Sequence, residues 1–196
     1  MRWLLILALL TPAAVIQQQQ GQQRTKPEVV QIGADYVAAP PTLAEAWEKS
    51  DVIVRVRVRD SKQTVRGTTS PRPTIEHSVR IEEVFKDDGS LKNKPEINLS
   101  QLGGTAVVKG VQYTVDTEDA PILKVGAEYV LFLRNPRQTG RYLLSLGPAS
   151  AFAVSGSTIE VPGLAQRMDV FDRKSKVPKD SLLEKLRSFK KTGGRL

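Results

Sequence analysis

Hydrophobic and polar residues alternate along much of this chain, and a period of two predicts β-strands. The clearest example is VIVRVRVR at residues 52–59, where every second residue is a valine. The valines are expected to face a core, and the intervening Arg55, Arg57 and Arg59 are expected to face outward. Residues 74–85 repeat the alternation and predict a second strand.

Further short strands are predicted downstream, separated by turn-forming residues. The segment EYVLFL at residues 128–133 is apolar on both faces, as a strand covered on both sides would be. The glycines of GGTAVVKGVQYTV indicate a hairpin or a similar segment that projects from the β-domain. The remaining strands are expected in EINLSQL, RYLLSL, AFAV and TIEV. Many short strands with turns between them indicate an all-β barrel or sandwich.

A short helix is predicted before the first strand. Thr42 and Glu45 have the spacing of a capping box, in which each side chain binds an unpaired backbone amide of the first turn. Leu43 and Trp47, four residues apart, give this helix one apolar edge.

A second, amphipathic helix is predicted near the C-terminus, with Ser181 as its N-cap and Glu184 completing another capping box. It should end before Gly193. Its apolar stripe consists of Leu182, Leu183, Leu186 and Phe189, and its basic residues are Lys185, Arg187, Lys190 and Lys191. This helix can bind an anionic lipid surface or a partner protein. The favoured interpretation is a helix docked on the β-domain, because such a stripe is also what a packed helix requires.

The N-terminal residues have the layout of a secretory signal peptide. Arg2 precedes an apolar run, and the small residues Ala13 and Ala14 follow it, so residues 1–14 are interpreted as a cleaved signal. The run is shorter than the about 20 apolar residues of a membrane-spanning helix. Residues 15–41 are rich in glutamine and proline and are interpreted as a tether. The chain contains no cysteine, so we expect an exported protein without disulfides and without a lipid-anchored cysteine.

The net charge of +8 is concentrated at the two ends of the chain. Residues 24–166 contain 18 Lys or Arg and 17 Asp or Glu, whereas residues 167–196 contain 10 basic and 4 acidic residues. A body that binds nucleic acid usually carries a concentrated positive face. The nearly neutral body, the expected export and the few aromatic residues available for base stacking therefore disfavour nucleic acid as a partner.

One resemblance covers about residues 42–162. The strings SDVIVRVRV, HSVRIEEVFK, INLSQLGGT, LKVGAEYVLFLR and RYLLSLGPASAFAV resemble an exported bacterial domain related to netrin-like and tissue-inhibitor-of-metalloprotease-like modules. The resemblance implies a five-stranded OB-type barrel. Tissue inhibitors of metalloproteases chelate the protease zinc through an N-terminal cysteine, which this chain lacks. No residue here therefore inherits that inhibitory role.

The arginine ladder, defined as Arg55, Arg57 and Arg59, has two interpretations. It can bind an anionic polymer, or its members can pair with glutamates on the neighbouring strand. The expected partners are Glu76 and Glu82, because opposite charges on adjacent strands stabilise a sheet. The second interpretation is favoured.

Other candidate chemistry is sparse. His77 is the only histidine, and its position in an apolar set of a strand favours a packed, hydrogen-bonded side chain over a catalytic base. The acidic segments 87–89 and 116–119 do not have the spacing of an EF-hand loop. A structural zinc site normally needs several His and Cys ligands, and this chain has one histidine and no cysteine. We therefore assign no catalytic residue, no metal ligand and no cofactor.

The sequence thus predicts a mainly β protein with a five-stranded OB-type barrel at residues 42–162, a short N-terminal helix and a C-terminal amphipathic helix. Residues 163–196 form a basic linker and that helix. The favoured function is a non-enzymatic binding or interaction module of the bacterial envelope or extracellular space. An alternative is an envelope hydrolase that uses clustered carboxylates. A further alternative is a domain that binds nucleic acid or another anionic polymer. Candidate contacts to a partner or an anionic membrane are Arg55, Arg57, Arg59, Lys185, Arg187, Lys190 and Lys191.

Overall fold

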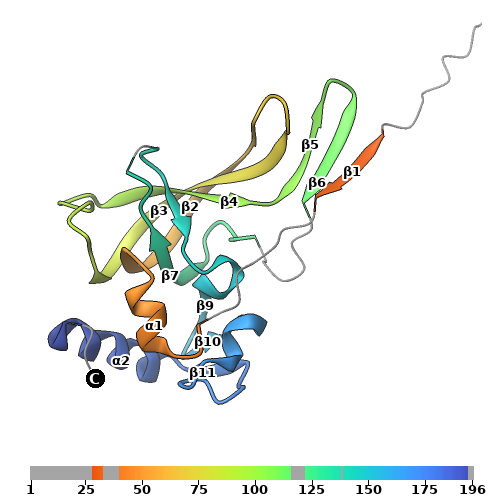
Figure 1. Cartoon of the computed structure of the whole chain (residues 1–196). Helices are drawn as coiled ribbons and strands as arrows, with labels where there is room; N and C mark the ends of the chain where they lie inside the picture. The colour runs from red at the N-terminus through yellow and green to blue at the C-terminus, as the bar shows by residue number, and fades with distance from the viewer. Residues whose placement is uncertain (1–27, 33–39, 116–121, 138, 194–196) are drawn as a thin grey trace, which may run out of the picture.

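The computed structural model describes residues 28–32, 40–115, 122–137 and 139–193 (Figure 1). These residues form eleven strands and two α-helices, so the expected mainly β architecture with an N-terminal and a C-terminal helix is confirmed. The expected signal peptide, most of the tether and the acidic segment 116–119 lie outside the described residues. The helices are α1 (Leu43–Glu48) and α2 (Lys179–Thr192). The strands are β1 (Val29–Ile32), β2 (Val52–Arg66), β3 (Arg72–Lys86), β4 (Glu96–Leu102), β5 (Gly104–Val108), β6 (Val111–Val115), β7 (Glu128–Arg134), β8 (Tyr142–Leu144), β9 (Ala151–Ser155), β10 (Thr158–Glu160) and β11 (Lys176–Pro178).

The strands of the described chain form two sheets, so the single five-stranded OB-type barrel that the resemblance implies is not confirmed. A three-stranded sheet has the order β1-β6-β5, and an eight-stranded sheet has the order β11-β10-β9-β7-β2-β3-β4-β8. Strand β8 also pairs with β7. The hairpin of β2 and β3 is longer than expected, with 15 residues in each strand. Three register shifts interrupt its ladder, and such bulges bend a strand and increase its twist.

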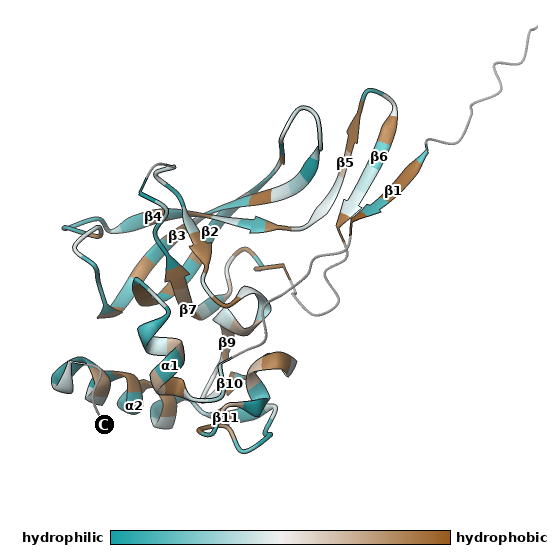
Figure 2. Cartoon of the chain, in the orientation of Figure 1, coloured by the Kyte–Doolittle hydropathy of each residue, from teal (hydrophilic) through white to brown (hydrophobic). Residues whose placement is uncertain are grey.

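The larger sheet separates two hydrophobic cores. The valine-side core contains Val52, Val54, Val56 and Val58 of β2, together with Val79, Leu91, Ile97, Leu99, Leu123, Tyr129, Leu131, Leu133 and Tyr142. The helix-side core contains residues of α1 and α2, the 3₁₀-helical segments and the opposite faces of β7 and β9. Strand β7 is buried on both faces, as its sequence predicts, and Figure 2 shows it as a strongly apolar strand.

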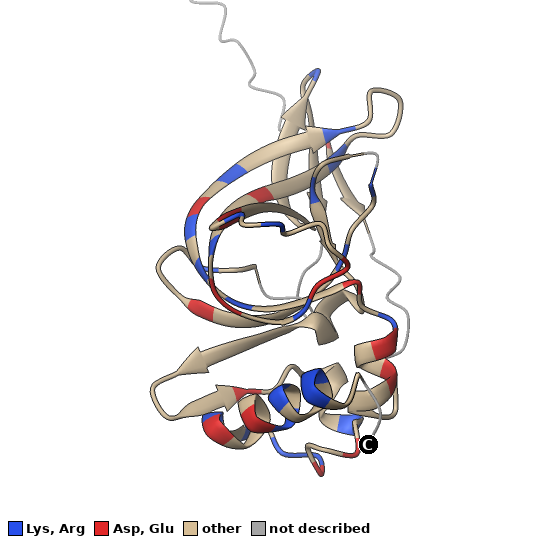
Figure 3. Ribbon diagram, turned by 90° about the vertical axis from the view of Figure 1, so that its left-hand side faces the viewer, with Lys and Arg blue, Asp and Glu red and all other residues tan. Residues whose placement is uncertain are grey.

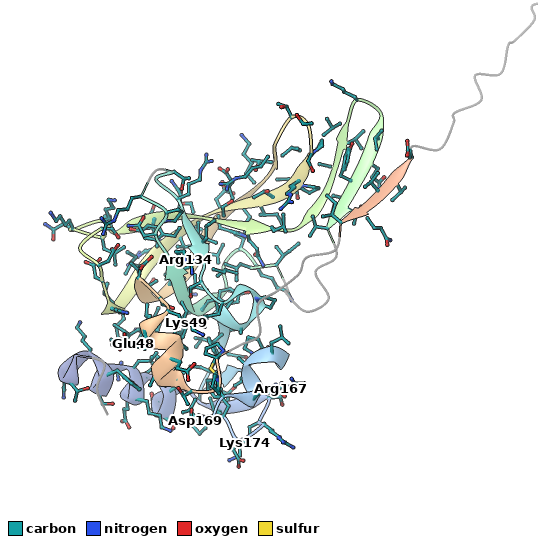
Figure 4. The ribbon with its side chains drawn as sticks, in the orientation of Figure 1. Glu48, Lys49, Arg134, Arg167, Asp169 and Lys174 are labelled. Carbon is teal, nitrogen blue, oxygen red and sulfur yellow. The ribbon has the colours of Figure 1, made fainter. Side chains whose placement is uncertain are left out.

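Helix α1 has Thr42 as its N-cap, as the sequence predicts, but only the Thr42 half of the capping box is seen among the described contacts. The Thr42 hydroxyl accepts a hydrogen bond from the backbone N–H of Glu45 over 3.1 Å. The Glu45 carboxylate lies 3.9 Å from Nζ of Lys49. A second N-terminal amide, that of Leu43, donates to Oδ1 of Asp169 over 3.2 Å, and Figure 4 shows Asp169 near the start of this helix. A residue distant in sequence therefore completes the cap.

Helix α2 begins at Lys179, so the predicted N-cap at Ser181 is wrong. Pro178 is the N-cap residue and makes no side-chain capping bond. The reason is tertiary: β11 pairs with β10 up to Pro178, and the helix follows at once. The predicted C-terminal end is confirmed, because Gly193 adopts a left-handed conformation with φ of 66°. Within the described chain, neither helix is long and apolar enough to cross a membrane.

Candidate binding site

Two residues of the arginine ladder, Arg55 and Arg57, are paired with glutamates, chiefly with Glu128 and Glu83. The Arg55 guanidinium lies 3.1 Å from Glu128 and 3.5 Å from Glu83. The Arg57 guanidinium lies 3.1 Å from Glu128, whereas its distance to the expected Glu82 is longer, at 4.0 Å. Figure 3 shows the resulting mixture of basic and acidic residues along the curved strands. Arg55 and Arg57 are therefore largely neutralised by neighbouring carboxylates.

The expected partner Glu76 is engaged elsewhere. Its carboxylate lies 2.9 Å from Nη1 of Arg141 and 4.0 Å from Nη2 of Arg66. The bulges of the hairpin explain the difference, because they place Arg55 opposite Glu83 instead of a residue of the predicted parity. Arg59 is exposed and takes part in no ion pair among the described residues. The ladder is therefore not a row of three free cations.

The basic C-terminal helix is docked on the β-structure, as the favoured interpretation predicts. Its four apolar residues are all buried in the helix-side core, and Phe189 stacks on Trp47 of α1 with ring centroids 5.4 Å apart. Three of its cations also contact the sheet. Nζ of Lys179 lies 3.7 Å from the Glu128 carboxylate on β7. Arg187 pairs with Glu83, and Nζ of Lys190 donates to the backbone carbonyl of Val84 over 2.8 Å. Lys185 and Lys191 remain exposed.

Three polar side chains form a row across β2, β3 and β4. Ser61 Oγ lies 2.7 Å from Nδ1 of His77, and Nε2 of His77 lies 3.2 Å from Oε1 of Gln101. The backbone N–H of Leu123 also donates to Oε1 of Gln101, which fixes the orientation of the amide. Nε2 of His77 must then carry the proton, and the Ser61 hydroxyl donates to Nδ1.

This row resembles a hydrolase triad in its order of groups, but its surroundings indicate a structural role. His77 is only 1 % exposed, and burial lowers its pKa below the ordinary value. A nucleophile and its base need open space for a substrate beside them. Of the three residues, Gln101 is the one that lines the hollows described next. The expectation of a packed, hydrogen-bonded histidine therefore agrees with the structure.

Two adjoining hollows form what we call the Gln101 groove. The larger has a volume of about 330 Å³ and the smaller about 190 Å³. Both are lined by Gln101, Leu144 and Pro148. The other residues of the larger hollow include Ile122, Lys124, Ala127, Tyr129, Ala151, Ala153, Ser155, Glu160, Val161 and Pro162.

The groove exists because small side chains line one of its walls. In the ladder between β7 and β9, Ala153 lies opposite Tyr129 and Ala151 lies opposite Leu131, so these alanines share the face of the valine-side core. The alternate residue Phe152 points into the helix-side core and fills it. Alanine methyl groups cannot fill the corresponding space on the other face, and a hollow remains.

Apolar residues predominate in the groove, but its polar residues include the charged Lys124 and Glu160. Gln101 is buried, and Oε1 of its amide is held by His77 and Leu123. The Tyr129 hydroxyl accepts a hydrogen bond from the backbone N–H of Lys124 over 3.1 Å. Oγ of Ser100, which lines the smaller hollow, is buried without a hydrogen-bond partner among the described residues. An apolar wall with a few fixed polar groups is typical of a site for small ligands.

The amino-acid pattern alone does not predict this groove, although the sequence of β9 carries a signal for it. In AFAV, alanine and large residues alternate on a strand that packs on both faces. Large side chains fill the space on one face of such a strand, and alanines leave space on the other. Whether that space stays open depends on the neighbouring strands.

The acidic turn that includes Asp87 forms local hydrogen bonds. Oδ1 of Asp87 accepts from the backbone N–H groups of Gly89 and Leu91. Over the ranges that the structure describes, no group of three or more metal-binding side chains is present.

The sequence matches no protein-family model, and no curated protein matches it.

Proposed function

We propose that the protein is an exported, non-enzymatic binding module whose core is an OB-type barrel of β2, β3, β4, β8 and β7. The strand pairing supports this architecture. The contacts run in the order β2-β3-β4-β8-β7 and return to β2, with β4 and β8 parallel and the other pairs antiparallel. A five-stranded, partly open barrel of this kind commonly carries a binding surface.

The Gln101 groove is the proposed ligand site. The observation that carries the proposal is the hollow of about 330 Å³ beside the alanines of β9. This volume lies at the lower end of the about 300–1,000 Å³ that is usual for small-molecule sites. The ligand is a small, mainly apolar molecule, because apolar side chains dominate the walls.

A neutral fluorophore such as N-phenyl-1-naphthylamine tests the proposal, because its emission rises in apolar surroundings. The variant Ala153→Leu should fill the groove and weaken binding of the fluorophore at least about tenfold. The matched control is Ala106→Leu on β5, which adds the same atoms outside the groove. Equal affinity in both variants, or no binding by the unaltered protein, would rule out the groove as the site.

The hydrolase that uses clustered carboxylates is less well supported. Glu83 and Glu128 both lie beside Arg55, and both carboxylates are held in ion pairs. The hydrogen bonds from Arg187 lower the pKa of Glu83, whereas a general acid requires a raised pKa.

An anionic membrane, polymer or nucleic acid is likewise a weaker proposal for the partner. The apolar stripe of α2 is packed in the helix-side core, so it is not available to enter a bilayer while the helix stays docked. Three of the seven candidate cations, Arg55, Arg57 and Arg187, are paired with carboxylates. The module is therefore proposed to act through its groove.

A further inference from the structure

Strand β1 stands apart from the rest of the described fold. It is four residues long, and it pairs in parallel with the edge of β6. None of its residues is buried, and none belongs to either hydrophobic core. Figure 1 shows it on the outer side of the projecting hairpin of β5 and β6. β1 is thus held mainly by its ladder to β6.

The ladder nevertheless specifies which sequence fits this edge. Val30 lies opposite Tyr113, and Ile32 lies opposite the buried Val115, so these two residues of β1 extend the inner face of the small sheet. The backbone N–H of Gln112 donates to the carbonyl of Glu28 over 2.8 Å. Without a strand here, β6 would present unpaired backbone groups, which are a template for pairing with another chain.

The outer face of the same sheet is apolar enough to favour association. Val29 and Val107 flank Gln112 in register, so they lie on one face. They are 55 % and 63 % exposed, respectively. A contact between the outer faces of two such sheets would remove both valines from water.

We propose that the edge of β6 is a strand-acceptor site and that β1 of a second copy of this chain occupies it, in a reciprocal strand-exchanged dimer. A second copy presents the same residues as the resident strand, so exchange preserves every hydrogen bond and side-chain contact of the ladder. Exchange between two copies closes with two-fold symmetry and exposes no new edge. This inference is independent of the Gln101 groove.

The absence of cysteine from the chain permits a clean test. The single variants Val29→Cys and Gln112→Cys place thiols on opposed residues of β1 and β6, on the outer face of the small sheet. Opposed residues on neighbouring strands lie about 5 Å apart, within the Cα separation of a disulfide. The two purified variants are mixed and gently oxidised at increasing protein concentration. Exchange predicts a covalent heterodimer whose yield rises with concentration, severalfold above a mixture of Gln112→Cys with Val125→Cys.

Val125 is the control because it is 59 % exposed and lies outside the three-stranded sheet. A second pair, Gln31→Cys with Thr114→Cys, guards against a folding defect in the first. The double variant Val29→Cys/Gln112→Cys reports where β1 sits within one chain. If it cross-links only internally and the mixed single variants stay at the control level, the proposal is overturned. Failure of both pairs to cross-link in any arrangement also overturns it, because β1 would then not occupy β6.

Discussion

The guanidinium of Arg187 on α2 donates two hydrogen bonds to the carboxylate of Glu83 on β3, from Nε over 2.8 Å and from Nη2 over 3.0 Å. The same carboxylate lies 3.5 Å from Arg55 of β2. The C-terminal helix and the arginine ladder, which appear as separate basic features in the sequence, are thus connected through one glutamate.

Arg187→Gln should raise the pKa of Glu83 toward its ordinary value, since the hydrogen bonds from Arg187 are the main cause of its lowering. The pair is partly exposed, so the loss of stability at neutral pH should stay below about 1 kcal/mol. A lowered folded-state pKa stabilises the protein above the unfolded pKa, and this contribution disappears as the pH falls through the folded pKa. NMR titration of Glu83 checks the shift. Lys185→Gln, on an exposed position of the same helix, should leave the titration unchanged.

Phe189→Ala should cost about 3–5 kcal/mol of stability, because it removes a buried ring that stacks on Trp47. Urea unfolding measures the loss. Lys185→Ala serves as the control and should unfold close to the unaltered protein. A Phe189 variant that unfolds like this control would mean that α2 is not docked in solution.

His77→Gln should destabilise the protein at pH 7 and should also flatten its pH dependence. The folded-state pKa of His77 is lowered by burial, so the unfolded chain binds the proton more readily. Stability from this residue is therefore present above the unfolded pKa of about 6.5 and is lost as the pH falls below it. The difference between the urea midpoints at pH 7 and pH 5 gives the slope of stability against pH, once for the variant and once for the unaltered protein. Identical slopes in the variant and the unaltered protein would show that His77 does not contribute this dependence.

Export should leave a mature N-terminus between about Ala13 and Gln20, given the apolar run and the small residues that follow it. Mass spectrometry of the protein recovered outside the cytoplasm locates this end. Recovery only as a membrane-held chain that begins at Met1 would contradict both cleavage and the proposed destination.

The sequence predicts the faces of β2 well, because the alternation of its valines is a local property. It does not predict the partners of Arg55 and Arg57, because those depend on bulges in the hairpin and on Glu128 from a distant strand. Register is set by the assembled sheet as well as by each strand's own pattern.

The start of α2 also depends on tertiary structure. Ser181 and Glu184 have a correct local capping pattern, but the ladder between β10 and β11 ends at Pro178 and lets the helix start earlier. The Gln101 groove also escaped prediction, because a row of alanines becomes a hollow only when the strands around it are known.

Strand β7 places Val130 and Phe132 in one core and Leu131 and Leu133 in the other. A change of side-chain volume there must satisfy two independent packing environments, whereas the exposed Arg59 of β2 lies in neither core. Over evolutionary time β7 should consequently diverge more slowly than any exposed strand of this fold. Its short apolar sequence would then be the most useful signature for recognising distant relatives.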